Sequence, residues 1–229
     1  MSVGVIIPAA GRGKRMGTKE SKQFLPLGDK PVLIHTLMVF ETHPEVDEIV
    51  VVAGAEEVSR VEEMVAQYGL EKISAIAIGG QERQDSVRSG LEHLQSEWVL
   101  VHDAARPFVT HGHITELLKV VRLHGAAILA VPVKDTIKQV DTAGIVERTP
   151  DRQSLWAVQT PQAFRRALLV QAHQRALEQG MTGTDDAMLV EELGIDVRVV
   201  MGDYQNIKLT TPEDLAIAEA IWKMRGTER

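Results

Sequence analysis

The sequence predicts an α/β fold built on a mostly parallel, doubly wound sheet of the Rossmann-like kind. Short β-branched apolar runs alternate with longer stretches of helical periodicity as far as Val131. Such alternation is typical of parallel strands joined by helices that cover both faces of a sheet. The chain of 229 residues contains no internal repeat or linker, so we treat residues 1–229 as a single domain.

The first strand is predicted from Val3 to Ile7, and it stops at Pro8 because proline has no N–H for the strand ladder. The same patterns predict strands at 48–53, 73–78, 98–102 and 126–131, and helices at 31–40, 56–68, 86–94 and 113–124. Asp85 or Ser86 is expected to cap the third helix. Later elements are helices at 164–179, after Thr184 and after Thr211-Pro212, and strands at 197–201 and around Ile207.

The alternation breaks at residues 134–159. Two short strand-like pieces, 137–140 and 145–147, flank the turn sequence Asp141-Thr142-Ala143-Gly144. The flanks are too polar for a central layer of the fold. We therefore expect a β-arm that either packs flat on its own domain or reaches a partner subunit.

A basic, glycine-punctuated loop follows the first strand. Between Gly11 and Lys22 the formal charge is +4, although the whole chain carries −7. Gly11, Gly13 and Gly17 allow backbone N–H groups to gather around an anion, and phosphate binds at this edge of open α/β sheets. The spacing matches neither G-x-G-x-x-G nor the Walker A loop, so a plain structural turn stays an open alternative.

The amino-acid composition argues against several classes of protein. The net charge of −7 argues against a general nucleic-acid binder. The absence of cysteine excludes disulfides and thiol catalysis, and it fits a reducing, cytoplasmic location. No run approaches 18 apolar residues and the start does not look like a signal peptide, so we expect neither membrane insertion nor secretion.

Several residues near predicted strand ends could carry chemistry. Asp103 follows a buried strand, where a carboxylate suits Mg²⁺ or merely caps a turn. Gly79-Gly80 with Ser86 could contact a nucleobase or form a plain turn. For the remaining candidates, a structural role is the first expectation. His102 is expected to be a structural histidine, and Asp151, Arg152 and Lys208 are expected to be solvated surface charges. Asp185 and Asp186 are expected to start a helix.

Together the motifs are more specific than any one of them. PAAGRGKRMG with Lys22 behind it, VHDAARP, TPQAF and NIKLTTPEDL resemble the 2-C-methyl-D-erythritol 4-phosphate cytidylyltransferase family, from Val3 to about Ile221. The resemblance implies a nucleotidyltransferase fold and transfer of CMP from CTP to a sugar-alcohol phosphate with Mg²⁺, in the non-mevalonate route to isoprenoids. It also implies a homodimer with interlocked arms.

The resemblance also implies roles for particular residues. Arg15 and Lys22 are expected to be catalytic on the triphosphate, and Arg152 and Lys208 to position the acceptor phosphate. Asp103 is expected to hold the metal. The remaining substrate contacts it implies are Pro8, Ala9, Ala10, Gly11, Gly13, Gly80, Ser86, Ala105, Arg106 and Thr136. Gln81, where some relatives have an acid, and Arg12 depart from the family pattern.

Three other functions remain to be weighed. A cytidylyltransferase for another acceptor, such as ribitol 5-phosphate, would share the nucleotide side. A Rossmann-type oxidoreductase is disfavoured by the late third glycine and the basic loop. Asp103, Arg152 and Lys208 count against a non-catalytic nucleotide-binding module, because a pure binder has no need of acceptor-side cations.

Overall fold

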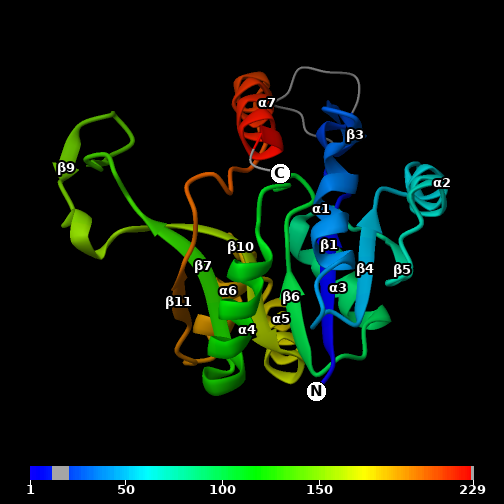
Figure 1. The fold of residues 1–229 in the computed structure, drawn as a ribbon. Coiled ribbons are helices and arrows are strands. Elements are labelled where there is room, and N and C mark those ends of the chain that lie inside the picture. The colour runs from blue at the N-terminus through cyan, green and yellow to red at the C-terminus, as the bar shows by residue number, and fades with distance from the viewer. Residues whose placement is uncertain (12–20, 228–229) are drawn as a thin grey trace.

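Seven strands form the central sheet, in the order β11-β7-β10-β6-β1-β4-β5 (Figure 1). The computed structural model describes residues 1–11 and 21–227. The strands are β1 Val3–Pro8, β4 Glu48–Ala53, β5 Ile73–Ile78, β6 Trp98–Val101, β7 Ala126–Pro132, β10 Trp156–Arg165 and β11 Arg198–Met201. Neighbours in this sheet pair in parallel, except where β10 pairs with β6 and β7. The predicted fold class, mostly parallel and doubly wound, is confirmed.

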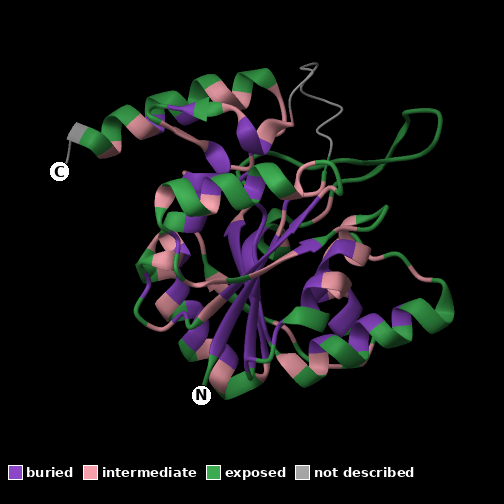
Figure 2. Cartoon of the chain, turned by 90° about the vertical axis from the view of Figure 1, so that its right-hand side faces the viewer, coloured by how far each residue is buried: buried purple, intermediate pink, exposed green. Residues whose placement is uncertain are grey.

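Helices cover both faces of the sheet because its inner strands are apolar on both sides. In β1, Val5 and Ile7 join one buried cluster and Ile6 joins the other, as the alternation of side chains along a strand requires. One layer contains α1 Val32–Glu41, α2 Val58–Tyr68 and α4 His111–His124, and the other contains α3 Arg83–His93, α5 Arg166–Gln179 and α6 Asp186–Glu191. Figure 2 shows the buried strands at the centre and the exposed outer faces of the helices.

A third, smaller cluster lies beside the carboxyl ends of the strands. Helix α7 Pro212–Thr227 packs there on the hairpin formed by β2 Pro26–Leu27 and β3 Lys30–Pro31. Leu27, Phe108 and Ile221 belong to this cluster, which the sequence reading did not anticipate as a unit. None of the described helices is both long and apolar enough to cross a membrane.

The central position of β10 corrects the sequence reading, which placed residues 156–159 in the arm and began the following helix at Phe164. Residues Trp156–Arg165 instead form a ten-residue strand between β6 and β7, and α5 begins at Arg166. Its pairing with β7 shifts between Val158 and Gln162, so Pro161 lies in an irregularity that needs no ladder N–H. The polar side chains Gln159, Thr160 and Gln162 are buried and make hydrogen bonds, which is why their polarity did not mark a surface segment.

Two further differences from the prediction exceed a shift of one or two residues. Helix α3 starts at Arg83, three residues earlier than expected, because Glu82 and Asp85 form a capping box in which Glu82 is the N-cap. No strand forms around Ile207 in the described chain; residues 205–210 are irregular there.

The arm leaves the sheet after β7 and returns as β10 (Figure 1). Its hairpin pairs β8 Gln139–Val140 with β9 Val146–Arg148, and Asp141 Oδ1 accepts hydrogen bonds from the backbone N–H groups of Ala143 and Ile145. Every residue from 134 to 149 is exposed. The arm therefore protrudes and does not pack flat on its own domain.

Candidate functional site

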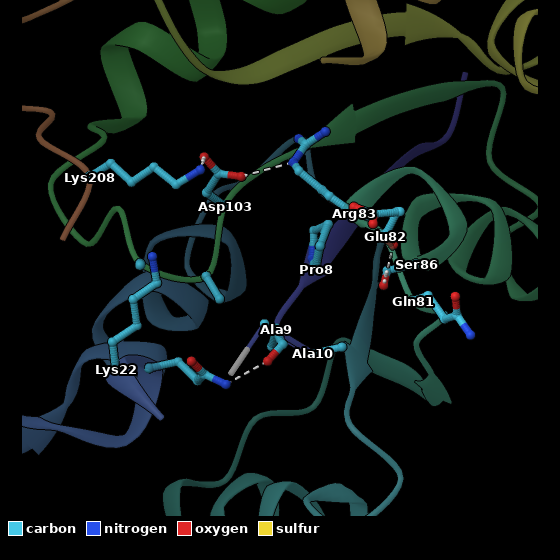
Figure 3. A pocket seen from close by; sticks show the side chains of 15 residues that line it. Pro8, Ala9, Ala10, Lys22, Gln81, Glu82, Arg83, Ser86, Asp103 and Lys208 are labelled. Carbon is cyan, nitrogen blue, oxygen red and sulfur yellow. Dashed lines mark hydrogen bonds and ion pairs between the residues drawn. The ribbon is translucent and has the colours of Figure 1, made fainter. Parts of the chain in front are cut away.

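The carboxyl ends of β1, β5 and β6 meet at one edge of the sheet and enclose a pocket (Figure 3). This is the edge at which open parallel sheets bind ligands. Fifteen described residues line the pocket: Pro8, Ala9, Ala10, Gly11, Lys22, Gln23, Gly80, Gln81, Glu82, Arg83, Ser86, Asp103, Ala104, Ala105 and Lys208.

The turn after β1 forms one wall of the pocket. The backbone N–H of Ala9 donates to the carbonyl of Val52 at 2.7 Å, and the buried Gln23 donates from Nε2 to the carbonyl of Ala9. These bonds hold the turn against β4 and bring Lys22, in the short helix Lys22–Phe24, to the pocket. The predicted residues Gly13 and Arg15 lie outside the described residues.

The turn between β5 and α3 forms the opposite wall, and its two glycines are required by close packing. A Cβ at Gly79 would lie 2.5 Å from the Cβ of Ala10 and 2.8 Å from the Oγ of Ser86, and one at Gly80 would collide with the side chain of Asp85. Ser86 is buried within α3, on the turn that lines the pocket. The predicted contacts Gly80 and Ser86 are thus brought beside Ala9 and Ala10 (Figure 3).

Asp103 sits between the two walls and faces three cations. Its Oδ1 lies 3.1 Å from Arg83 Nε, and its Oδ2 lies 2.8 Å from Lys208 Nζ and 3.5 Å from Arg106 Nε. Burial alone would raise the pKa of this carboxyl, but the charges of Arg83, Lys208 and Arg106 outweigh burial and hold its pKa far below the usual value. Asp103 is therefore ionised at any physiological pH, and the cluster carries a net positive charge.

His102 supports this cluster without facing the pocket. Thr160 Oγ1 accepts from the Asp103 backbone N–H at 3.0 Å and lies 3.1 Å from His102 Nδ1, while His102 Nε2 lies 3.0 Å from the carbonyl of Arg106. A carbonyl can only accept, so Nε2 carries the proton and Nδ1 accepts from the Thr160 hydroxyl. Burial lowers the pKa of His102 to about 4, so this neutral form persists, in agreement with the structural role expected for it.

Sequence reasoning missed Arg83, which lines the pocket and contacts Asp103 directly. It is the first residue of α3, where the helix dipole disfavours a cation. A cation three residues after Gly80, close behind a strand and its glycine pair, was a signal that the sequence did offer. Gln23 was also missed, because a lone glutamine carries no pattern.

Two predicted acceptor contacts are not brought to this pocket within the chain. Arg152 and Thr136 both lie on the arm and do not line the cavity; Arg152 Nη1 donates to the carbonyl of Lys134 at 2.9 Å. Arg106 reaches Asp103 from outside the lining and donates from Nη1 to the carbonyl of Asn206 at 2.7 Å. Lys208, the other predicted acceptor-side cation, does line the pocket.

The cluster fits Mg²⁺ of the kind that bridges to a nucleotide, although it does not form a metal cage. Within the described part of the chain, no group of three or more His, Cys, Asp or Glu side chains could hold a metal ion. Mg²⁺ often uses one or two carboxylates and takes its other ligands from water and substrate phosphates. A carboxylate offers about four acceptor positions, and three cations face Asp103, so a position remains on Oδ1.

Comparison with known proteins gives one consistent answer. Residues 3–224 match the sequence model of the family described as 2-C-methyl-D-erythritol 4-phosphate cytidylyltransferase. Two proteins of that name, from Alkaliphilus metalliredigens and Geobacillus kaustophilus, are each 52% identical to this chain. The alignments cover 97% of this chain and 94% of the first relative, and 100% of both this chain and the second.

Solved structures agree with these sequence matches. The crystal structure of 4-diphosphocytidyl-2C-methyl-D-erythritol synthase from Anaerococcus prevotii superposes with a TM-score of 0.85 at 32% identity, covering 97% of this chain and 98% of that one. The 2-C-methyl-D-erythritol 4-phosphate cytidylyltransferase from Thermus thermophilus superposes with a TM-score of 0.79 at 36% identity, covering 97% and 100% of the two chains.

Proposed function

The chain belongs to the 2-C-methyl-D-erythritol 4-phosphate cytidylyltransferase family, and we propose that the pocket at the carboxyl edge of its sheet is the site of that family's reaction. The enzyme transfers CMP from CTP to 2-C-methyl-D-erythritol 4-phosphate. The products are 4-diphosphocytidyl-2-C-methyl-D-erythritol and pyrophosphate, and the step belongs to isoprenoid precursor synthesis. The observation that supports this placement is the cationic cluster around Asp103, between two glycine-containing turns.

The chemistry is an in-line displacement at the α-phosphorus of CTP. A phosphate oxygen of the acceptor forms the new P–O bond, and the bond to pyrophosphate breaks on the opposite side. A phosphate monoester is largely ionised near neutral pH, so the reaction needs charge screening more than a general base. This requirement matches a pocket whose described lining includes the cationic side chains of Lys22, Arg83 and Lys208 but no Cys or His.

The proposal gives a role to each of the following residues. Lys22, together with Arg15 from the loop, stabilises the charge that develops on the triphosphate, and Pro8–Gly11 with Gly13 bind its phosphates. Gly80, Ser86 and Ala105 contact the cytosine and ribose. Lys208 attracts the acceptor phosphate from the other side of the pocket, and Arg106 adds its positive charge from behind Asp103, outside the lining.

Asp103 would hold Mg²⁺ together with phosphate oxygens of CTP. When bound, the ion supplies Lewis-acid polarisation of the phosphoryl group. The Asp103 carboxylate also keeps Lys208 2.8 Å away, which fixes the ammonium group at the pocket before substrate arrives.

The homodimer also belongs to the proposal, and the protruding arm supports it. Ile137, Val140, Ile145 and Val146 are between 40% and 65% exposed on the hairpin of the arm. Exposed apolar side chains of this number on a two-stranded hairpin need a partner surface, because such a hairpin is barely stable alone. We assign the arm to a second copy of the chain, where Arg152 and Thr136 would complete the partner's pocket.

The single-domain organisation over residues 1–229 and a cytoplasmic location remain predictions.

One assay tests the proposed function. Pyrophosphate release is measured with CTP, UTP, ATP and GTP in turn, with 2-C-methyl-D-erythritol 4-phosphate as acceptor and then with ribitol 5-phosphate. Rapid release only with CTP and the methylerythritol phosphate is expected. Faster turnover with ribitol 5-phosphate would replace the acceptor assignment, and no release with either acceptor would refute the transferase assignment of this pocket.

A further inference from the structure

A line of four side chains, in contact with one another, runs from the pocket into the protein, and the inner half of the line has no role in the reaction described above. Arg83 Nη1 lies 2.6 Å from Asp186 Oδ2, and His173 Nε2 lies 3.0 Å from Asp186 Oδ1. The side chains of Asp186 and His173 are only 1% and 2% exposed. Since Arg83 also pairs with Asp103, the line joins Asp103, Arg83, Asp186 and His173 in that order.

Helix stability does not explain this arrangement. Arg83 is the first residue of α3, and a cation there opposes the helix dipole. Burial lowers its pKa, but the carboxylates of Asp186 and Asp103 more than compensate and raise it above the ordinary value. Asp186 is likewise more than a helix-start residue, because the N-cap role in α6 belongs to Asp185, which accepts from the Met188 N–H at 2.9 Å.

The guanidinium of Arg83 is divided between two carboxylates. An arginine fork commonly binds both oxygens of a single carboxylate with two parallel hydrogen bonds. Here Nε donates to Asp103 Oδ1 at 3.1 Å and Nη1 donates to Asp186 Oδ2 at 2.6 Å. Asp103 Oδ2 is therefore left to pair with Lys208. The third nitrogen, Nη2, is buried and has no hydrogen-bond partner among the residues that the structure describes.

We propose that Asp186 is a positioning residue for CMP transfer, which holds the Arg83 guanidinium off Asp103 Oδ2 and so keeps that oxygen and Lys208 turned to the pocket. Asp186 does not line the pocket, so it acts through Arg83. The inference rests on the proposed function only for its effect on rate. The geometry of Arg83 and Lys208 can be tested without turnover.

The position of Asp186 is itself fixed from the central sheet. Gln162 Oε1, on β10, accepts from the backbone N–H groups of Asp186 and Ala187, both at 3.2 Å. Gln162 Nε2 donates to Asp185 at 2.8 Å. Strand β10 also supplies Thr160, whose hydroxyl oxygen accepts from the backbone N–H of Asp103, so one strand holds both Asp103 and Asp186 in place.

The test compares Asp186→Asn with the matched control Asp185→Asn. Both replacements are nearly isosteric, and both lie at the start of α6, but only the first removes the charge that holds Arg83. Asp186→Asn is expected to lower kcat per CTP-binding site by about 10- to 100-fold, as loss of an orienting partner does, with KM for CTP changed less than about threefold. Calorimetric titration with CTP gives the number of intact binding sites. Asp185→Asn, which keeps an N-cap acceptor, should retain kcat within about threefold.

A second readout does not depend on catalysis. In Asp186→Asn the released guanidinium can take both oxygens of Asp103, so Lys208 loses its partner and should be acetylated faster than in the wild type or Asp185→Asn. Acetic anhydride labelling mapped by mass spectrometry measures this rate. Unchanged labelling of Lys208, or equal kcat values for the two variants, would overturn the proposal. A wild-type enzyme inactive with CTP but showing the labelling difference would refute only the proposed function.

A third comparison covers the case in which Asp186→Asn does not fold, since breaking a buried ion pair is strongly destabilising whereas removing both partners is better tolerated. Arg83→Gln and the double variant Arg83→Gln/Asp186→Asn should have the same kcat, because Asp186 then has nothing to position. A further fall of tenfold or more in the double variant would show that Asp186 acts by another route and would overturn the proposal.

Discussion

At the carboxyl edge of the sheet, charged side chains hold one another in place, whereas along the arm they face solvent. Asp103 is ion-paired with Arg83, Arg106 and Lys208 and is itself buried. Residues 134–149 of the arm are exposed throughout, and the polar contacts of Lys138 and Arg148 stay within the hairpin. The difference shows that the charged cluster around Asp103 is held in place by contacts within one chain. The acceptor contacts proposed for the arm depend on assembly.

The largest effect is expected from Asp103→Asn, which removes the one negative charge facing three cations. Turnover should fall on the order of 100-fold or more, and the remaining activity should need higher Mg²⁺ concentrations. Pyrophosphate release at increasing Mg²⁺ measures both changes. Asp141→Asn, in the turn of the arm, serves as the control and should behave like wild type. An Asp103→Asn enzyme with the wild-type Mg²⁺ titration would reduce Asp103 to a turn residue.

The next largest effect is expected in a subunit-exchange experiment, which tests whether Arg152 of the arm acts on the pocket of its own chain or on that of the partner. Lys22→Ala and Arg152→Ala should each be nearly inactive alone. If the arm acts on the partner's pocket, a fully exchanged equal mixture should recover about a quarter of wild-type activity, because half of the dimers are mixed and each has one intact site.

Lys22→Ala mixed with Lys208→Ala is the matched control for this exchange. Both residues line the same pocket of one chain, so every site in that mixture lacks one of them. Recovery in the first mixture and none in the second is the expected pattern. With exchange verified by mass spectrometry, equal failure of both mixtures would mean that Arg152 does not work in trans.

The same contrast explains what the sequence could predict. Strand β4 was placed at its observed bounds because a buried parallel strand leaves a nearly continuous apolar run. The edge strand β5 was also placed at its observed bounds, because its mostly apolar run stops at Gly79-Gly80. Strand β10 was missed because its buried polar residues find partners only in the folded protein, as Gln159 does with the carbonyl of Asp203. Pro161 also argued against a central strand, because proline cannot donate to the strand ladder. The shift in pairing that accommodates it is visible only in the folded sheet.

The candidate site divides along similar lines. Lys22, Asp103 and Lys208 were identified through motifs, and the structure brings them to one pocket. Arg83 and Asp186 were not recognised as a pair, because they are 103 residues apart and meet only when α3 and α6 pack on the same face of the sheet. Local pattern carries no information on such a contact.

An intermediate effect is expected on the pH dependence of the unfolding free energy, through the buried His102 beside Asp103. The pKa of His102 is about 4 in the folded protein and near 6.5 when unfolded, so the unfolded state takes up the proton first as pH falls. His102 therefore causes stability to fall below pH 6.5, with the loss complete below pH 4. Between pH 7 and pH 5 this amounts to about 2 kcal/mol. Urea unfolding in EDTA should show a pH 7 to pH 5 difference smaller by that amount in His102→Gln. An undiminished difference would assign the pH dependence to other groups.

The smallest effect on stability is expected in the arm, where the consequence should appear in assembly. Val146 is 53% exposed, so Val146→Asp removes little buried apolar area within its own chain. The unfolding free energy of the dissociated chain should change by no more than about 0.5 kcal/mol, as for surface substitutions in general. The same change places a charge beside the exposed Val140, which pairs with Val146 in the hairpin, and a partner surface would have to desolvate that charge, so dimer dissociation should increase. Leu123→Asp, at an 80% exposed position on α4, introduces the same charge away from the arm and should leave sedimentation unchanged. If Val146→Asp destabilised the monomer by several kcal/mol without altering sedimentation, the arm would have to pack on its own chain, and the contrast between the two regions would fail.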